Sequence, residues 1–157
     1  MPLNTESVWD YPRPAICEPF TGHLKIIVNK QILADTRRAY RSLETSHPPC
    51  YYFPPEDVHS HFLKPNSHSS LCEWKGQAHY VDWQDHQNRI VDIGWFYKNP
   101  SRRFHDIAGY ISFYASKAEA CFVNGEQVSA QEGDFYGGWI TRNLKGPFKG
   151  GTGTLGW

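Results

Sequence analysis

Short apolar runs separated by turn residues dominate the hydrophobic pattern of this chain. The runs at 24–28 and 31–34 flank Asn29-Lys30, a spacing typical of a hairpin with a two-residue turn. No window longer than two helical turns keeps a 3.6-residue apolar period. Further strands are expected at 38–44, 70–74, 77–83, 89–97, 110–114 and 120–123. The pattern therefore predicts a mainly β protein, a single compact antiparallel β domain with short helical turns.

The segment 89–97 is the clearest predicted strand. Ile93, Trp95 and Tyr97 occupy alternate positions and are expected to share one face of the sheet. Asn124-Gly125 is the strongest hairpin signal in the chain. Helical turns are expected at 54–57, where two prolines precede two acids, and at 101–106.

The two ends of the chain differ in composition from the middle. Residues 1–23 are rich in proline and carry Trp9 and Tyr11, so we interpret them as an extended strap laid over the domain. The last 25 residues contain eight glycines and five aromatic residues, which indicates a packed, irregular tail with close backbone approaches; a mobile tail is the alternative. The predicted organisation is a strap at 1–23, a β domain at 24–128 and a tail at 129–157.

Composition narrows the classes of function. The 157 residues suit one domain. Lysine plus arginine equals aspartate plus glutamate at 16 each, and this neutral balance disfavours general attraction to nucleic acid or to an anionic membrane. No apolar stretch approaches the ~20 residues that span a bilayer, and the first residues lack the features of a secretory signal. We therefore expect a cytoplasmic protein whose four cysteines, with no C-x-x-C among them, are free thiols.

Three segments together carry a family resemblance: YYFPPEDV at 51–58, LCEWKGQAHY at 71–80 and GWFYKNPSRRFHDIAGYISFY at 94–114. In this order and spacing they resemble the domains of unknown function numbered 427, over about residues 24–128. The flanking WDYPRP and GDFYGGWI resemble the longer bacterial-type members. The resemblance implies a compact β-rich domain similar to β-tent folds, and it implies no established function.

Two positions depart from the family pattern. Glu73 stands where the Cys-Pro-Trp-Lys-Gly motif has proline, and Gly94 stands where alanine precedes the central tryptophan. A nucleotidyltransferase-like label is sometimes attached to the family. This chain has no Gly-Ser followed by a spaced Asp-x-Asp pair that would hold catalytic Mg²⁺, so its residues do not support that label.

Trp74 and Lys75 are the first candidates for chemistry. A large ring beside a cation could stack a flat ligand and hold an anionic group on it. A core tryptophan with a solvent-facing lysine is the alternative. If Lys75 is buried among aromatic rings, it becomes a usable base or Schiff-base amine. Arg41 could bind a carboxylate or phosphate, with Glu44 as a general base; a structural ion pair between the two is the alternative.

Aromatic residues supply the rest of the predicted site. Rings with polar tips line small-molecule sites, and they equally form the core of a small sheet. The predicted catalytic residues are Glu44 and Lys75. The predicted ligand-binding residues are Arg41, Tyr52, Trp74, Trp95, Tyr97 and Tyr110.

No metal or cofactor is expected. His59-x-His61 could present two imidazoles on one side of an extended segment, yet nothing in the spacing makes further donors converge. The chain lacks a Gly-x-Ser-x-Gly elbow, a P-loop and a dinucleotide fingerprint.

The main functional hypothesis is binding of a small anionic or aromatic molecule in an aromatic-lined pocket, with acid–base catalysis on the bound ring compound left open. A nucleotide or single-stranded nucleic-acid module is one alternative, although the neutral charge argues against it. A purely structural or protein-interaction domain, such as a homodimer, is the other. The sequence does not decide whether the protein is an enzyme.

Overall fold

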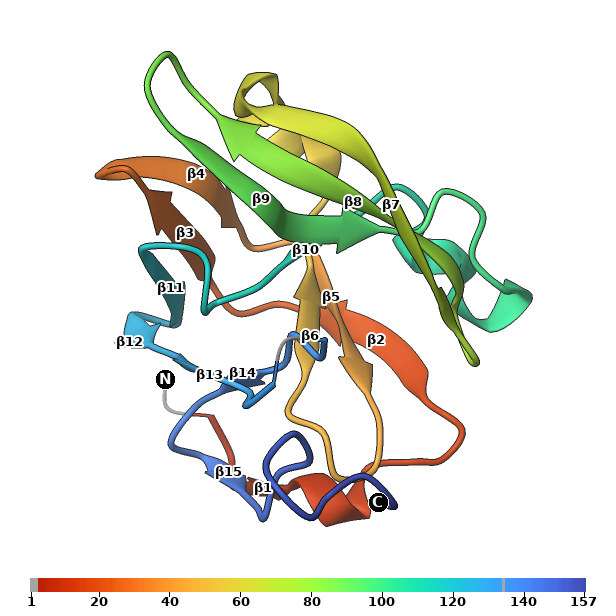
Figure 1. The fold of residues 1–157 in the computed structure, drawn as a ribbon. Coiled ribbons are helices and arrows are strands. Elements are labelled where there is room, and N and C mark those ends of the chain that lie inside the picture. Colours follow the sequence, from red (N-terminus) through yellow and green to blue (C-terminus); the bar gives the residue numbers. More distant parts are fainter. Residues whose placement is uncertain (1–2, 134) are drawn as a thin grey trace.

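The computed structural model describes residues 3–133 and 135–157, and its architecture is mainly β (Figure 1). The longest strands form a four-stranded antiparallel sheet in the order β10-β9-β8-β7. Their bounds are β7 (Leu63–Cys72), β8 (Gly76–Gln84), β9 (Arg89–Phe96) and β10 (Ile111–Phe113). The prediction of an antiparallel β architecture is thus confirmed.

Two further antiparallel sheets complete the middle of the chain. One has the order β12-β11-β3-β4, with β3 (Leu24–Val28), β4 (Gln31–Thr36), β11 (Ala120–Val123) and β12 (Glu126–Gln127). The other has the order β2-β5-β6, with β2 (Ile16–Phe20), β5 (Ala39–Leu43) and β6 (Cys50–Tyr52). The helical elements are short 3₁₀ turns: η1 (Val8–Asp10), η2 (Pro55–Asp57), η3 (Ser60–Phe62) and η4 (Arg102–Ile107).

The flanking segments meet at one end of the molecule (Figure 1). There β1 (Glu6–Ser7) pairs in parallel with β15 (Leu144–Lys145). A second short pair joins β13 (Ser129–Ala130) to β14 (Trp139–Ile140). The tail therefore contacts the N-terminal segment through β15, and it contacts the β domain through Trp139, whose backbone N–H donates to the Pro49 carbonyl at 2.8 Å.

Both predicted hairpin turns are present. Asn29 and Lys30 have φ values of 51° and 64°, and Asn124 and Gly125 have φ values of 49° and 82°. Two successive residues with positive φ form the turn whose twist matches that of the paired strands. Asparagine and glycine adopt this conformation at low cost, so the Asn124-Gly125 turn follows from local chemistry, whereas the other turn holds a lysine at positive φ.

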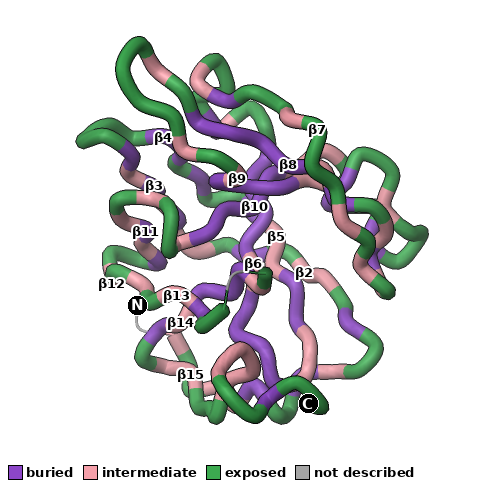
Figure 2. Tube along the Cα trace, viewed as in Figure 1, coloured by how far each residue is buried: buried purple, intermediate pink, exposed green. Residues whose placement is uncertain are grey.

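Most buried residues gather in two clusters, seen as the purple stretches at the centre of Figure 2, and a small third cluster joins Val8 and Tyr11 to Leu43. The larger cluster includes Trp139, whose indole Nε1 donates to the Phe113 carbonyl at 3.0 Å. The smaller cluster is mostly aromatic and contains Trp95 and Tyr97. Ile93, which we expected on the same face as these two rings, belongs to the larger cluster. Strand β9 thus contributes to both.

Strand β7 is longer than its predicted range of 70–74. It begins at Leu63, and Trp74 lies in the turn that leads to β8. The segment 63–69 is nearly all polar because β7 is the edge strand of its sheet and most of its side chains are exposed. Pro65 is tolerated there for the same reason. An exposed edge strand does not need apolar alternation, so the pattern did not reveal it.

None of the helices in the described part of the chain has the length and apolar character needed to cross a membrane.

Candidate functional site

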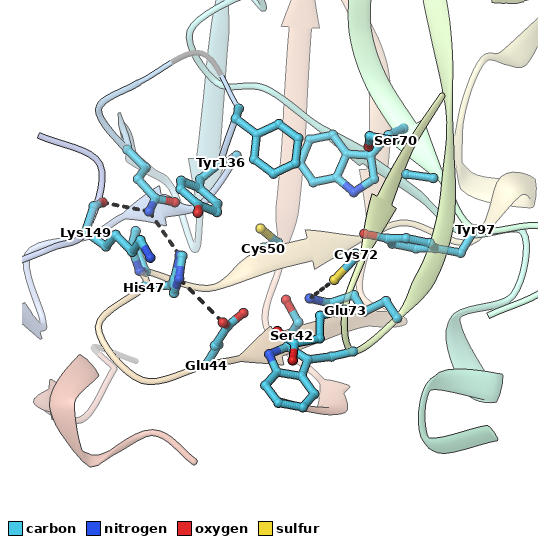
Figure 3. Close-up of a pocket in the computed structure, with 18 of the residues that line it drawn as sticks. Ser42, Glu44, His47, Cys50, Ser70, Cys72, Glu73, Tyr97, Tyr136 and Lys149 are labelled. Atoms are coloured by element: carbon cyan, nitrogen blue, oxygen red, sulfur yellow. Dashed lines mark hydrogen bonds and ion pairs between the residues drawn. The ribbon is translucent and has the colours of Figure 1, made fainter. Parts of the chain in front are cut away.

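A pocket of about 450 Å³ opens where the two ends of the chain meet the β domain (Figure 3). Its lining comes from β5, β6 and the loop between them, from the end of β7 and the β7–β8 turn, from β8 and β9, and from the C-terminal tail. Arg13 and Tyr114 complete the lining. Residues that are close in sequence therefore supply only part of it.

Five aromatic side chains form the inner wall, and each is at most 6 % exposed. They are Tyr52, Tyr80, Trp95, Tyr97 and Tyr114. The Trp95 and Tyr114 rings pack with their centroids 4.6 Å apart. Burial raises the pKa of the Tyr52, Tyr97 and Tyr114 phenols well above the ordinary value, so these hydroxyls stay protonated. The wall is apolar with neutral polar tips.

Lys75 brings a positive charge into this surround. The residue is 7 % exposed. Its Nζ lies 4.0 Å from the Cys72 sulfur and 5.3 Å from the centre of the Phe104 ring. Within residues 3–133 and 135–157, no carboxylate oxygen lies within 4.0 Å of this nitrogen. The ammonium group of Lys75 is therefore nearly buried without an opposite charge beside it, an arrangement that costs free energy.

The turn that carries Lys75 is held by Ser101. Gly76 has a φ of +111°, a conformation that other residues rarely adopt. The Ser101 backbone N–H donates to the Lys75 carbonyl at 2.9 Å, and the Ser101 hydroxyl donates to the Trp74 carbonyl at 2.7 Å. These bonds tie the turn to the start of η4 and fix where the ammonium enters the pocket.

The pocket thiol of Cys50 is fully protonated near neutral pH. Burial raises its pKa to about 11, although the nearby Lys75 charge acts in the opposite direction. The protonated thiol is therefore a small apolar part of the wall and a poor nucleophile.

Glu44 and His47 form the polar side of the pocket (Figure 3). The His47 Nε2 lies 3.6 Å from Glu44 Oε2, and the Gln131 amide nitrogen lies 3.2 Å from His47 Nδ1. Burial lowers the His47 pKa to about 4, and the positive charges of Lys149 and Lys75 add to the effect. The imidazole is thus neutral at physiological pH.

The C-terminal tail closes the pocket over Trp95. A Cβ atom on Gly137 would lie 2.2 Å from the Trp95 indole, and one on Gly138 would lie 2.4 Å from the Pro48 carbonyl oxygen. The Tyr114 hydroxyl donates to the Phe135 carbonyl at 2.9 Å. A side chain at Gly137 would collide with the indole and one at Gly138 with Pro48, which explains the Gly-Gly pair in the tail.

Six of the eight sequence-predicted site residues line this one pocket. They are Tyr52, Trp74, Trp95, Tyr97, Glu44 and Lys75. Arg41 and Tyr110 are not among its lining residues. The Tyr110 ring packs edge-on against Tyr40 at 5.8 Å.

Arg41 is occupied by an ion network outside the pocket. Its guanidinium donates two hydrogen bonds to Glu6, at 2.9 and 3.0 Å, and one to Glu18 at 2.9 Å. Arg41 therefore does not pair with Glu44. Within the described part of the chain, the carboxylate partners of Arg41 are Glu6 and Glu18. Glu6 belongs to β1, so the pair joins the N-terminal segment to β5.

Sequence reasoning missed the pocket residues that come from loops and from the tail. The polar ones are Arg13, His47, Gln131, Tyr136 and Lys149. Neither His47 nor Gln131 stands in a sequence motif that indicates a place in this pocket. The glycine–aromatic composition predicted that the tail packs, yet it could not indicate against which surface.

The comparison with known families now bears on these residues. The model of a family described as Domain of unknown function (DUF427) matches residues 16–124. The chain belongs to this family. No curated protein matches the sequence. The DUF427 match includes Glu44, His47 and Lys75, whereas Gln131 and the other tail residues of the pocket lie beyond it. The pocket is therefore built by the DUF427 domain together with Arg13 before it and with the C-terminal tail after it.

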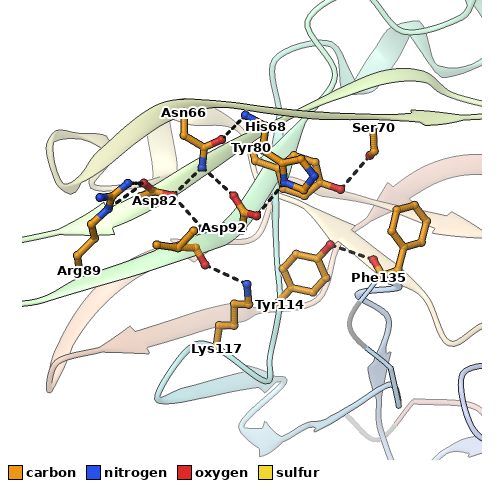
Figure 4. Close-up of polar contacts among 11 residues, drawn as sticks. Asn66, His68, Ser70, Tyr80, Asp82, Arg89, Asp92, Tyr114, Lys117 and Phe135 are labelled. Carbon is orange, nitrogen blue, oxygen red and sulfur yellow. Dashed lines mark hydrogen bonds and ion pairs between the residues drawn. The ribbon is translucent and has the colours of Figure 1, made fainter.

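A polar network on β7, β8 and β9 adjoins Tyr80 of the pocket wall (Figure 4). Asp82 is 2 % exposed and accepts hydrogen bonds from Arg89, from Asn66 and from the backbone of β9. The His68 ring stacks on Tyr80 with centroids 4.1 Å apart. The Tyr80 hydroxyl is 2.9 Å from the Ser70 hydroxyl, and both residues line the pocket. The network holds the Tyr80 ring in place.

Within the described ranges, no group of three histidine, cysteine, aspartate or glutamate side chains is arranged to hold a metal ion. The rings of His59 and His61 have their centroids 6.3 Å apart, and neither residue lines the pocket.

Proposed function

We propose that this DUF427 protein binds a small anionic molecule that carries a flat ring, with Lys75 as the anchor for the anion. The observation that carries the proposal is the position of Lys75: the residue is 7 % exposed, it lines the pocket, and it has no carboxylate partner within 4.0 Å among residues 3–133 and 135–157.

Burying a charge without an opposite charge costs free energy. A structural lysine would ordinarily extend to solvent along its flexible chain. A cation held inside a pocket is instead neutralised when an anionic group binds there. The same group would also gain from the low local dielectric, which strengthens its attraction to the ammonium.

The rest of the pocket supports a flat ligand. Its volume of about 450 Å³ lies in the usual range for small-molecule sites, roughly 300–1,000 Å³. Buried rings supply apolar walls, and Trp74 is a partly exposed ring next to Lys75 in sequence. Arg13 and Lys149 also line the pocket, but both donate to the Trp157 carbonyl oxygen at 3.3 Å. Among the cations of the described lining, Lys75 is therefore the one left to meet an anion.

In this proposal Glu44 would move a proton on the bound molecule. It lines the pocket as a partly exposed carboxylate, and no arginine or lysine of the described chain pairs with it within 4.0 Å. Acid–base catalysis on the bound ring compound is the catalytic part of the proposal.

The test measures whether the pocket prefers charge. Benzoate, nicotinate and indole-3-acetate are each paired with the corresponding neutral primary amide. Trp74, Trp95 and Trp157 line the pocket, so tryptophan fluorescence reports binding directly. We expect at least one carboxylate to bind about tenfold more tightly than its amide, equivalent to ~1.4 kcal/mol.

Lys75→Met should remove this preference because it deletes the charge and keeps an apolar side chain. Lys98→Met, at an exposed position outside the pocket lining, is the matched control and should keep the preference. Equal affinity for acid and amide in all three pairs would contradict the proposal. Quenching by a single-stranded oligonucleotide that disappears at moderate salt would favour the nucleic-acid alternative instead.

A further inference from the structure

The side-chain amide of Gln131 has only one orientation that satisfies its neighbours. The Gly138 backbone N–H donates to Gln131 Oε1 at 3.0 Å. The amide nitrogen donates to the Lys149 carbonyl oxygen at 2.7 Å. A flipped amide would place two donors against each other at Gly138 and two acceptors against each other at Lys149. Gln131 is 4 % exposed, so water cannot relieve such a mismatch.

The fixed amide dictates the protonation of His47. The second hydrogen on Gln131 Nε2 points to His47 Nδ1, 3.2 Å away, and Nδ1 must accept it. A neutral imidazole has one accepting nitrogen and one donating nitrogen. The proton therefore sits on Nε2, the nitrogen that faces Glu44 Oε2 at 3.6 Å.

The surroundings of His47 disfavour a second proton. The residue is 8 % exposed, and its ring packs edge-on against Tyr136 with centroids 4.7 Å apart. Lys149, Lys75 and Arg13 are the cations that act on it, and Glu44 is the opposing carboxylate. Burial is the largest effect and lowers the pKa of His47 to about 4.

We propose that Gln131 is a positioning residue that holds His47 as the neutral Nε2–H tautomer, so that the pocket presents an uncharged donor beside the Glu44 carboxylate. A ligand group fits this pair when it accepts from Nε2–H and donates to the carboxylate. Hydroxyl groups do both. The ligand class is thus narrowed to a flat anion that also carries a hydroxyl group, and this ligand statement rests on the proposed function above.

The tautomer is tested without any ligand. Proton–nitrogen correlation NMR of the histidine side chains distinguishes an Nε2–H imidazole from an Nδ1–H imidazole and from the doubly protonated ring. The chain has eight histidines. The His47 signals are assigned by their loss in His47→Gln and by through-space contact with the Tyr136 ring. In the wild-type protein we expect His47 to remain the neutral Nε2–H form at about pH 5.5, where an ordinary histidine with a pKa near 6.5 is mostly charged.

Gln131→Glu tests the role of the amide. The glutamine amide donates a hydrogen bond to His47 Nδ1, whereas a glutamate carboxylate accepts one from it. The carboxylate therefore stabilises a proton on Nδ1. We expect His47 in this variant to take up a second proton at a pH at least one unit higher than in the wild type. Gln127→Glu, the same change at an exposed position, is the control and should leave the His47 titration unchanged. An Nδ1–H or doubly protonated His47 at pH 5.5 in the wild type would overturn the proposal even if Gln131→Glu does not fold.

The ligand statement has its own test. The three isomers of hydroxybenzoate are compared with benzoate by tryptophan fluorescence, in the wild type and in His47→Phe. At least one isomer should bind fivefold more tightly than benzoate, and His47→Phe should abolish the difference. Equal binding of all four compounds overturns the hydroxyl preference. If none of the four binds, the proposed anion site fails for benzoates, while the NMR result still decides the tautomer.

Discussion

A methyl group added at Gly137 tests whether the tail closes the pocket as described. In Gly137→Ala the new Cβ would lie 2.2 Å from Trp95 Cη2 and 2.6 Å from Cζ3. Ordinary van der Waals contact begins at about 3.4 Å, so the tail or the indole must move by about 1.2 Å, the difference between 3.4 and 2.2. The indole is not free to move away because the Tyr114 ring packs against it, with the ring centroids 4.6 Å apart.

The expected cost follows from overpacking. Inserting a methyl group into a well-packed site costs roughly 1–3 kcal/mol. For a domain of this length each kcal/mol lowers the melting temperature by about 2–4 °C. Gly137→Ala should therefore lower the melting temperature by roughly 2–12 °C. Binding of the flat carboxylate probes should weaken as well, because the tail and Trp95 both line the pocket.

Urea and thermal unfolding measure the effect, with Gly156→Ala as the control. A Cβ at Gly156 would meet nothing within 4 Å, so that change should stay within about 0.5 kcal/mol. A double variant separates packing from backbone strain. Trp95→Phe shortens the ring that meets the new methyl group, so combining it with Gly137→Ala should cost at least 0.5 kcal/mol less than the sum of the single changes.

Two results would refute this reasoning. Gly137→Ala could be as stable as the wild type, which would mean that the tail does not press on Trp95. Alternatively, the two substitutions could add without any coupling, which would place the strain somewhere other than the indole.

Two further predictions concern pH and the N-terminal ion network. Because the His47 pKa is lowered to about 4, the unfolded chain binds more protons than the folded chain between about pH 4 and 6.5. The free energy of unfolding should thus fall on the order of 2–3 kcal/mol as the pH drops through this window. Urea unfolding of His47→Gln should lack this contribution of His47 to the pH dependence. An equal decrease in the two proteins would contradict the prediction. Arg41 lowers the pKa of Glu6 through its hydrogen bonds, so this pair stabilises the fold above the ordinary glutamate pKa and the contribution is lost as the pH falls through the lowered value. Arg41→Ala should reduce the free energy of unfolding at pH 7 by about 1–3 kcal/mol and flatten its dependence on pH below about 4.5. Arg38→Ala, at an exposed ion pair, should cost much less, and equal losses in the two variants would count against the role of burial.

Much of the fold was predictable because it rests on local chemistry. The Asn29-Lys30 and Asn124-Gly125 turns, the 3₁₀ turns after the prolines and the short strands of β3, β9 and β11 all follow from residue types at fixed spacings. The polar edge strand β7 was only partly predicted. Its outward side chains face water, and no apolar period is needed to build it.

The candidate site was predictable where an aromatic ring and a charged side chain stand next to each other in one sequence motif. Trp74 and Lys75 stand together in the sequence as a ring beside a cation, and both line the pocket. Arg41 was a different case. Its role depends on Glu6 and Glu18, and residue identity alone cannot tell whether an arginine will meet a ligand or a carboxylate of its own chain.

What the sequence determined by itself is the class of architecture, the turns and an excess of rings over charges. Which of those rings enclose a pocket was decided only by tertiary structure. His47 and Gln131 meet across 84 positions of the chain, and Gly137 reaches Trp95 only after the tail has folded back over the sheet. Contacts between such distant positions depend on how the sheets stack and how the tail returns, and no local pattern of hydrophobic and polar residues records that geometry.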